Sequence, residues 1–307
     1  EKALVLADHA SFEDRQSSAR DDGRHIGMGI SSYVEDTGLG PYEGTTVRVQ
    51  PNGKVLVRSG SASQGQGHHT FIAQIVAETL AVSLEDIVFE SGDTGKFPHG
   101  VGTIGSRIAV NVGPSAYEAA NAVKDKAIKL ASETLEAAEQ DLELSSGKVQ
   151  VKGIEDLSVS LGDLARTLSP KAGGKVPSGF VPSLEATSYT GSNGSPFASG
   201  TNVAEVEVDI LTGNVKLINY SVAHDCGTII NPKIVDGQII GGVVHGIGNA
   251  LFERMIYSEG GQPLTNTYAD YLLPLATEMP NIEIVHEESA SPLNVLGIKG
   301  AGEGGTI

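Results

Sequence analysis

Apolar residues recur every three to four positions along residues 115–140, which predicts a long amphipathic helix. The stripe consists of Ala120, Val123, Ala127, Leu130 and Leu135. Pro114 directly precedes this segment, so we expect the helix to begin only after the proline. The same spacing predicts helices over residues 70–81 and 234–254, and residues 1–22 are predicted to form a polar helix followed by a linker.

Two stretches alternate apolar and polar residues on both sides of a turn sequence, which is the pattern of a β-hairpin. The first covers residues 45–59 with the turn Pro51-Asn52-Gly53, and the second covers residues 203–222 with the turn Thr212-Gly213-Asn214. Shorter strands are predicted at residues 27–34, 87–90, 149–151 and 282–286. Because the strands come as hairpins and alternate irregularly with helices, we predict an α+β fold.

A stretch rich in proline, glycine and serine, residues 169–200, separates the two halves of the chain. Such a composition is typical of a linker, and 307 residues are enough for about two domains of roughly 150 residues each. We therefore expect two α+β subdomains, a first of residues 1–190 and a second of residues 191–307.

Composition and charge exclude several classes of partner. The chain holds 21 Lys and Arg against 38 Asp and Glu, and the net charge of −17 opposes binding to nucleic acid or to an anionic membrane surface. No apolar run reaches the ~18 residues of a membrane span. With a single cysteine, Cys226, the chain has no intrachain disulfide and no cysteine-built iron–sulfur or zinc site. The absence of disulfides favours a cytoplasmic location.

Glycine is enriched to 39 of 307 residues, and four segments combine it with isolated polar groups. Residues 64–70 stand at a predicted helix start, where free N–H groups suit an anion; an ordinary strand-to-helix turn is the alternative. Residues 100–107 match the spacing G-x-G-x-x-G, but no strand leads into them, so they do not form a dinucleotide fingerprint. They fit either a cradle for a polar ligand or a surface loop.

The other two segments lie in the second half of the chain. The segment His224-Asp225-Cys226-Gly227 ends a strand, and a predicted helix that contains five glycines and His245 follows it. Because glycine destabilises a helix, this helix needs stabilisation from close packing or from a ligand. Cys226 and the histidines are either structural or form the nucleophile and base of a thiol enzyme. Residues 297–305 place one carboxylate, Glu303, among five glycines. This is typical of a functional group close to a bulky ligand, with a flexible linker as the alternative.

Together these segments resemble the molybdenum-cofactor-binding part of the xanthine dehydrogenase and aldehyde oxidase family, the molybdenum hydroxylases. Within that family the chain is most similar to the C-terminal half of the large subunit of aerobic carbon monoxide dehydrogenases. The resemblance runs from about residue 23 to residue 307 and rests on three motifs in order. These are Gln64-Gly65-Gln66-Gly67-His68 with Ala73-Gln74-Ile75, then Asp225-Cys226-Gly227 with Ile230-Asn231-Pro232, and finally Lys299-Gly300-Ala301-Gly302-Glu303.

The resemblance implies a molybdenum–molybdopterin cofactor, in bacterial members usually the cytosine dinucleotide form. It also implies hydroxylation of an aldehyde, a purine or other N-heterocycle, or a related carbon centre, with water as the oxygen source. By motif position Glu303 matches the catalytic general base, and no residue of this chain is expected to ligate the metal. The expected cofactor contacts are Gln66, Gly67, Thr103, Ser106, His245, Lys299 and Gly302. Electrons are expected to leave through 2Fe-2S clusters and FAD on partner domains or subunits.

Two features depart from the family pattern. His245 stands where many relatives carry glutamine, and the family's first half of the molybdenum domain is not in this sequence. That half supplies the copper-binding cysteine of the carbon monoxide enzymes, and Cys226 lies outside its motif, so no copper site is transferred. We therefore expect a separate subunit or a fragment that completes its site with a partner.

A cofactor-free interaction or scaffold module is the alternative function. It has no need for Glu303 together with Gln66, Thr103 and Ser106, so their presence favours the enzyme. A single cofactor that touches all of these residues would require the loops of Gln66, Thr103 and Glu303 to converge.

Overall fold

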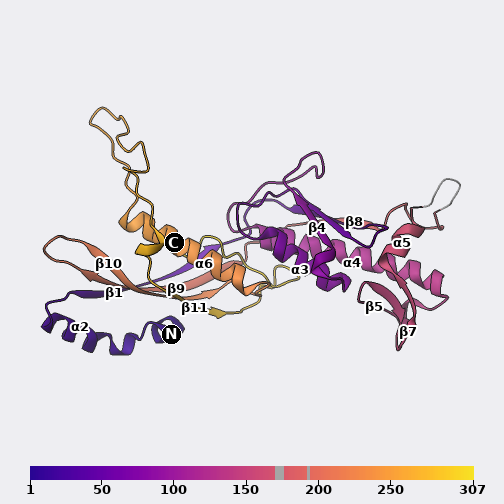
Figure 1. Ribbon diagram of the computed structural model, residues 1–307, viewed down its shortest axis with the longest axis horizontal. Helices are drawn as coiled ribbons and strands as arrows, with labels where there is room; N and C mark the ends of the chain where they lie inside the picture. The colour runs from indigo at the N-terminus through magenta and orange to yellow at the C-terminus, as the bar shows by residue number, and fades with distance from the viewer. Residues whose placement is uncertain (170–175, 192–193) are drawn as a thin grey trace. The chain divides into compact units, whose positions relative to one another are not determined.

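The computed structural model describes residues 1–169, 176–191 and 194–307 (Figure 1). The described chain divides into two compact units. The terminal unit consists of Glu1–Thr37, Pro196–Ser291 and Gly297–Ile307, and the middle unit consists of Gly38–Ser195 and Pro292–Leu296. This division passes between residues 195 and 196, close to the predicted boundary, but it groups residues 1–37 with the second half of the chain.

A four-stranded sheet of order β1-β9-β10-β11 organises the terminal unit. β1 (Ile26–Asp36) pairs antiparallel with β9 (Phe197–Val208) along its whole length, and this pairing places the N-terminal residues with the second half. β9 and β10 (Val215–Asp225) form the predicted second hairpin, which is thereby confirmed. β10 pairs parallel with β11 (Ile282–Glu287).

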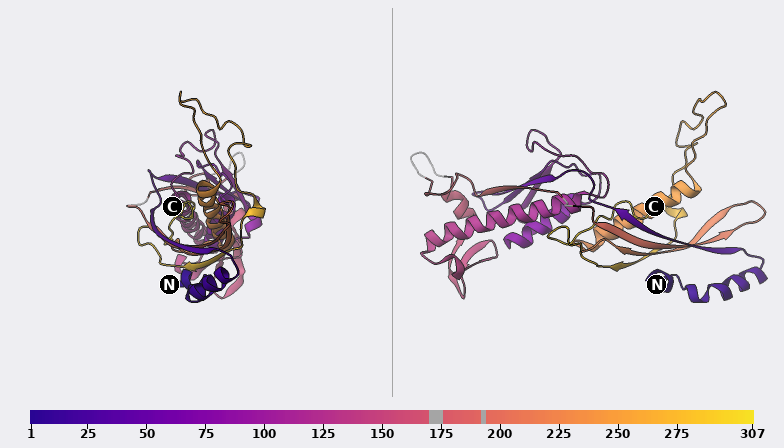
Figure 2. Two further views of the ribbon diagram at one scale, coloured as in Figure 1. Left: turned by 90° about the vertical axis from the view of Figure 1, so that its left-hand side faces the viewer. Right: turned by 180° about the vertical axis from the view of Figure 1, so that it is seen from behind.

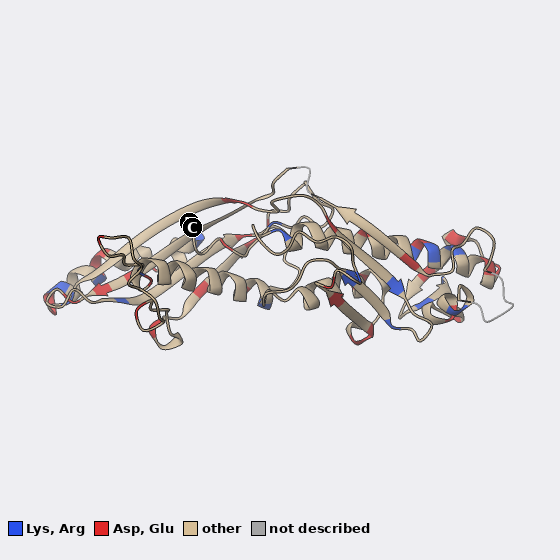
Figure 3. Ribbon diagram, turned by 90° about the horizontal axis from the view of Figure 1, so that it is seen from above, with Lys and Arg blue, Asp and Glu red and all other residues tan. Residues whose placement is uncertain are grey.

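Helices lie on both faces of this sheet. α6 (Pro232–Leu251) covers one face, and its apolar side packs into a core of Leu217, Val222, Ile239, Val243 and Ile247. α1 (Lys2–Leu6) and α2 (Phe12–Asp21), joined by a 3-10 turn at His9–Ser11, occupy the other face, as Figure 2 shows from behind. α6 carries charged residues only near its start, at Lys233 and Asp236, and is otherwise uncharged in Figure 3.

The middle unit contains a second four-stranded sheet of order β4-β3-β2-β8 and a three-stranded sheet of order β5-β6-β7. The first sheet consists of β2 (Glu43–Val49), β3 (Val55–Ser59), β4 (Ile87–Ser91) and β8 (Glu185–Thr190). The second consists of β5 (Leu142–Ser145), β6 (Lys148–Val151) and β7 (Ile154–Ser160). The helices are α3 (His68–Leu80), α4 (Ile108–Leu135) and α5 (Leu161–Thr167), and 3-10 turns occur at Leu84–Asp86 and Glu139–Asp141. The α+β fold and the first predicted hairpin, formed by β2 and β3, are confirmed.

The start of α4 corrects one prediction. The helix begins at Ile108 and contains Pro114, although we expected it to start after the proline. A proline inside a helix costs about 3 kcal/mol because it lacks one N–H and crowds the preceding turn. Packing of the residues around the proline outweighs this cost, since Val110, Val112 and Ala116 are fully buried. In addition, the hydroxyl of Ser115, the residue after the proline, donates a hydrogen bond to the Val112 carbonyl at 3.0 Å.

The part of the chain that the structure describes has no helix both long and apolar enough to cross a bilayer.

Candidate functional site

Two of the glycine-rich segments form adjoining loops in the middle unit. The Thr103 hydroxyl donates a hydrogen bond to the Ala62 carbonyl at 2.7 Å, which joins the loop of Gln66 to the loop of Thr103. The loops touch a second time through glycine backbone, since a Cβ on Gly100 would lie 2.6 Å from the Gly60 carbonyl oxygen. The loops that carry the predicted cofactor residues Gln66 and Thr103 therefore adjoin each other at Ala62 and Gly60.

The Gln66 loop ends at the start of α3. Gly67 caps the helix with a left-handed φ of 73°, and the Gln66 Oε1 accepts the N–H of Gln64 at 2.5 Å. The first N–H groups of a helix lack intrahelical acceptors and carry the positive end of its dipole, so they suit an anionic group. Burial lowers the pKa of His68 in the first turn, so this imidazole is neutral at pH 7 and packs against Phe71.

A buried ion pair that the sequence did not reveal fixes the Thr103 loop. Arg107 is 1% exposed, and its guanidinium contacts the carboxylate of Glu43, which is fully buried. The same guanidinium donates to the carbonyls of Leu39, Pro41 and Gly102 at 2.6, 2.5 and 3.0 Å. An arginine directly after a glycine-rich run is the one signal that could have pointed to this anchor.

The middle-unit residues fit a polar, anionic cofactor such as a pterin dinucleotide. Gly65 and Gly102 have left-handed φ angles of 110° and 109°, and a Cβ on either would meet no heavy atom within 4 Å. Their backbone is therefore open to a ligand on that side. Ser106 also takes a left-handed φ, of 48°, which is unusual for a residue with a side chain. The Gln66 side-chain amide and the N–H groups at the start of α3 form a donor set suited to phosphate and pterin oxygens. The Thr103 hydroxyl, whose proton goes to Ala62, can accept a hydrogen bond from a pterin N–H group.

The glycine-rich segment at residues 297–305 carries Glu303 in the terminal unit, and it lies between α6 and the sheet. A Cβ on Gly304 would overlap the Tyr33 hydroxyl of β1, and a Cβ on Gly305 would overlap the Val243 N–H group of α6. The Thr306 hydroxyl donates to the Gly242 carbonyl at 3.1 Å. Glu303 is exposed on this tightly packed backbone.

The glycines of α6 serve two different faces. Cβ atoms on Gly242 and Gly246 would lie 3.1 Å and 2.8 Å from the N and O atoms of Gly305, so these two glycines admit the Glu303 segment. This close packing stabilises α6 and so offsets part of the cost of its glycines. Gly237 and Gly241 face open space, and His245 is exposed on the same helix.

Lys299 links the motif of Asp225-Cys226-Gly227 to the motif that carries Glu303. Its ammonium donates to Asp225 at 2.9 Å and to the Ser289 hydroxyl at 2.8 Å, and its backbone N–H donates to the Cys226 carbonyl at 2.8 Å. Burial opposes ionisation of Asp225, but hydrogen bonds from Ser289, Gly227 and Lys299 outweigh it and lower the pKa of the carboxyl. Lys299 thus anchors the glutamate segment to the end of β10.

Cys226 does not have the properties of a catalytic thiol. It is 3% exposed, and burial together with the neighbouring Asp225 raises the pKa of the thiol to about 12. A nucleophilic cysteine needs the thiolate form near neutral pH, which this site disfavours. The thiol-enzyme interpretation is therefore not supported, and Cys226 serves the fold through its backbone contact with Lys299.

The described structure groups the predicted site residues into two sets. Gln66, Gly67, Thr103 and Ser106 lie in the middle unit, whereas His245, Lys299, Gly302 and Glu303 lie in the terminal unit. Convergence of the two sets on one cofactor stays a prediction. Among the described residues, no group of three or more His, Cys, Asp or Glu side chains could hold a metal ion.

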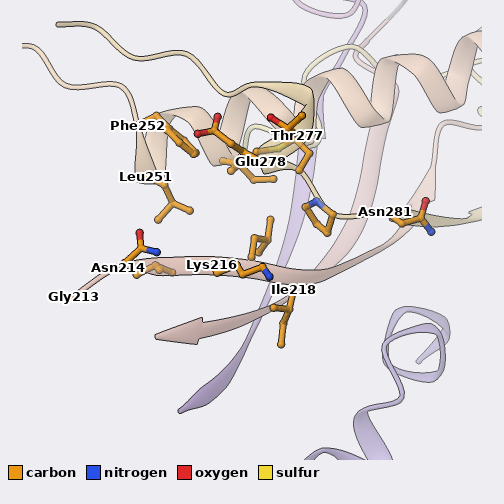
Figure 4. A pocket seen from close by; sticks show the side chains of 14 residues that line it. Gly213, Asn214, Lys216, Ile218, Leu251, Phe252, Thr277, Glu278 and Asn281 are labelled. Carbon is orange, nitrogen blue, oxygen red and sulfur yellow. The ribbon is translucent and has the colours of Figure 1, made fainter. Parts of the chain in front are cut away.

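A separate cavity of about 690 Å³ lies in the terminal unit, between the start of β10 and the end of α6. Figure 4 shows Leu251 and Phe252 on the helix side and Asn214 and Lys216 on the strand side. None of the predicted cofactor residues lines this cavity.

The fold and its glycine-rich loops define a cofactor-binding domain. The family model described as the molybdopterin cofactor-binding domain matches residues 2–280, and the chain belongs to this family. The resemblance to molybdenum hydroxylases drawn from the motifs is thereby confirmed.

Relatives and solved structures agree with this assignment. The chain is 40% identical over 307 residues to the 6-hydroxypseudooxynicotine dehydrogenase complex subunit gamma of Paenarthrobacter nicotinovorans, covering 100% of this chain and 38% of that subunit. It is 34% identical over 316 residues to the carbon monoxide dehydrogenase large chain of Hydrogenophaga pseudoflava, covering 98% of this chain and 39% of that one. The crystal structure of quinoline 2-oxidoreductase from Pseudomonas putida 86 superimposes with a TM-score of 0.89 at 37% identity, over 99% of this chain and 40% of that one. The chain thus spans about two fifths of the length of these relatives.

Proposed function

We propose that this chain is the cofactor-binding part of a molybdenum hydroxylase that oxidises a carbon centre with water as the oxygen source. The observation that carries the proposal is the exposed Glu303, held on glycine backbone between α6 and the sheet. Among aldehydes, purines and other N-heterocycles, and related carbon centres, N-heterocycles are favoured. The support is that relatives at 38% and 37% identity are named nicotine 6-hydroxylase and quinoline 2-oxidoreductase.

The cofactor proposed is the molybdenum–molybdopterin group in its cytosine dinucleotide form. Gln66, Gly67, Thr103 and Ser106 would hold it through amide, hydroxyl and helix N-terminal groups, and Gly302 would allow its close approach. When bound, the group supplies the redox centre that takes two electrons from the substrate. His245 and Lys299 complete the proposed set, and the ammonium of Lys299 acts through its ion pair with Asp225.

Glu303 acts as the general base in this proposal. Its carboxylate accepts the proton that water releases when its oxygen is transferred to the substrate carbon. A base is effective only at hydrogen-bond distance from that proton, so the backbone that carries it must be fixed. Packing of Gly304 on Tyr33 and of Gly305 on α6 supplies this rigidity.

The partners proposed are the rest of the molybdenum domain, on a separate subunit or in the same chain, and domains or subunits that carry 2Fe-2S clusters and FAD. A cytoplasmic location is part of the same proposal. An arm after the end of α6 offers a surface for such a partner (Figures 1 and 2). The arm and the adjoining helix end expose Leu251, Met255, Ile256, Tyr257, Leu264, Tyr268, Leu272, Leu273 and Leu275. So many exposed apolar side chains in one segment are typical of a binding surface.

Metal analysis of the intact enzyme, with mass spectrometry of the released pterin, tests the cofactor proposal. We expect about one molybdenum per chain and a cytosine dinucleotide. Reduction of the enzyme by nicotine, quinoline, xanthine and carbon monoxide is then compared, and the compound that reduces it fastest becomes the probe substrate. Absence of molybdenum and pterin from the intact complex would favour the scaffold module instead.

A further inference from the structure

A tyrosine and a histidine meet across the sheet of the terminal unit, directly behind the Glu303 segment. Tyr33 on β1 and His224 on β10 both pair in register with Gly200 on the strand between them. The three residues therefore form one row across the sheet. The Tyr33 Oη lies 2.6 Å from the His224 Nδ1, which is a hydrogen bond between two strands that do not pair with each other.

Gly200 is what allows this bond. A Cβ at this position would lie 2.6 Å from the Tyr33 Oη, so any other residue would block the phenol ring from crossing β9. Tyr33 is 8% exposed and His224 is 1% exposed, so water does not compete for the bond. Within the described residues the other ring nitrogen of His224, Nε2, has no hydrogen-bond partner. The bond to Tyr33 is therefore the contact that orients the imidazole.

The same hydroxyl touches the glutamate segment. Gly304 is buried, and a Cβ on it would overlap the Tyr33 Oη, so the residue next to Glu303 packs directly on the hydrogen-bonded hydroxyl. The segment is held from the other side by α6 and at its beginning by Thr37, whose hydroxyl accepts the Gly300 N–H at 3.0 Å. Tyr33 is thus the side chain that supports the segment at its centre.

The pair is uncharged near neutral pH. Burial, reinforced by the nearby His286, lowers the pKa of His224 to about 4 despite the opposing effect of Asp225. Burial and the Glu35 carboxylate raise the pKa of Tyr33 above its ordinary value. A neutral hydrogen bond in a buried row keeps its geometry without a counter-ion, which suits a fixed support.

We propose that Tyr33 and His224 form a positioning pair that fixes the backbone of Gly304 and thereby the carboxylate of Glu303. This role rests on the proposed function of Glu303 as the general base. Neither residue is proposed to touch substrate or cofactor. Loss of the hydroxyl would leave a space under Gly304, and the segment would sample positions in which the carboxylate is misplaced.

The test compares four variants of the intact, molybdenum-loaded enzyme. Tyr33→Phe removes only the hydroxyl, and His224→Leu removes its partner. His224→Asn keeps a hydrogen-bonding atom near the position of Nδ1 and serves as the rescue variant. Tyr220→Phe is the matched control, because it removes a half-buried hydroxyl from β10 in the same sheet, in the cluster packed against α6.

Two measurements are made on each variant, the rate of enzyme reduction by the probe substrate and the hydrogen exchange of the amides in residues 300–306. Misplacement of a reacting group by ~1 Å costs about 10²-fold in rate, so we expect a loss of roughly tenfold for Tyr33→Phe and His224→Leu. KM and molybdenum content should stay near wild type. Exchange in residues 300–306 should accelerate in these two variants, and His224→Asn should recover much of both effects.

The outcomes separate this inference from the function of Glu303. If Glu303→Gln is inactive but Tyr33→Phe matches Tyr220→Phe in rate and in exchange, the positioning role is wrong and the general base stands. If Glu303→Gln reduces at the wild-type rate, the general base is wrong whatever the Tyr33 variants do. Unchanged exchange of residues 300–306 in both Tyr33→Phe and His224→Leu would overturn the positioning role on its own.

Discussion

Replacing Gly246 of α6 with alanine tests whether the helix glycines hold the Glu303 segment in place. A Cβ on Gly246 would lie 2.8 Å from the carbonyl oxygen of Gly305. To reach an ordinary contact of 3.4 Å, this backbone oxygen must retreat by about 0.6 Å. Gly241 on the same helix is the matched control, because a Cβ there meets no heavy atom within 4 Å.

The two substitutions share one effect and differ in another. Each replaces a helix glycine by alanine, which favours the helix by up to about 1 kcal/mol. Gly241→Ala should therefore raise the melting temperature by roughly 2–4 °C. Gly246→Ala also overpacks a buried contact, which costs about 1–3 kcal/mol, so we expect it to be neutral or destabilising. Displacement of the segment that carries Glu303 should lower the rate by roughly tenfold.

Both variants are made in the intact enzyme and compared with wild type. Thermal unfolding gives the stability difference, and rapid-mixing reduction by the probe substrate gives the rate. Molybdenum content is measured in each preparation, so that a loss of cofactor is not taken for a loss of rate. A Gly246→Ala enzyme as stable and as fast as Gly241→Ala would refute the role assigned to the helix glycines.

Three further predictions concern single groups. Glu303→Gln should slow enzyme reduction by about 10²–10⁴-fold at unchanged molybdenum content, since it keeps the shape but removes the base; a wild-type rate would end that assignment. Glu43→Gln should destabilise the middle unit by about 3–5 kcal/mol because it leaves the buried Arg107 charge uncompensated, and a melting curve like that of wild type would contradict this. Cys226, with a pKa of about 12, should resist alkylation by iodoacetamide at pH 8 in the folded enzyme. Because folding raises the pKa of the Cys226 thiol from the ordinary 9.0, the stability that the thiol contributes should be complete below pH 9 and should disappear as the pH rises toward 12. Rapid labelling of the folded enzyme at pH 8 would contradict this prediction.

The sequence by itself determined the elements whose signals are local. The alternation around Pro51-Asn52-Gly53 and Thr212-Gly213-Asn214 fixed two hairpins, and the helical stripe from Ala120 to Leu135 fixed most of α4. Periodicity and turn chemistry act over a few residues, so the chain carries them without reference to its fold. The three motifs around Gln66, Asp225 and Glu303 likewise identified the family, because residue types at fixed spacing are visible in the sequence itself.

Only the tertiary structure decided which distant residues meet. The pairing of β1 with β9 joins Tyr33 to Gly200, and nothing in the local pattern of either strand specifies its partner. Burial of Arg107 against Glu43 and the contact of Gly246 with Gly305 depend in the same way on chain segments far apart in sequence. Pro114 lies inside α4 because packing of its buried neighbours outweighs a local preference. Local preferences amount to a few kcal/mol at most, whereas long-range packing selects among the alternatives that they leave open.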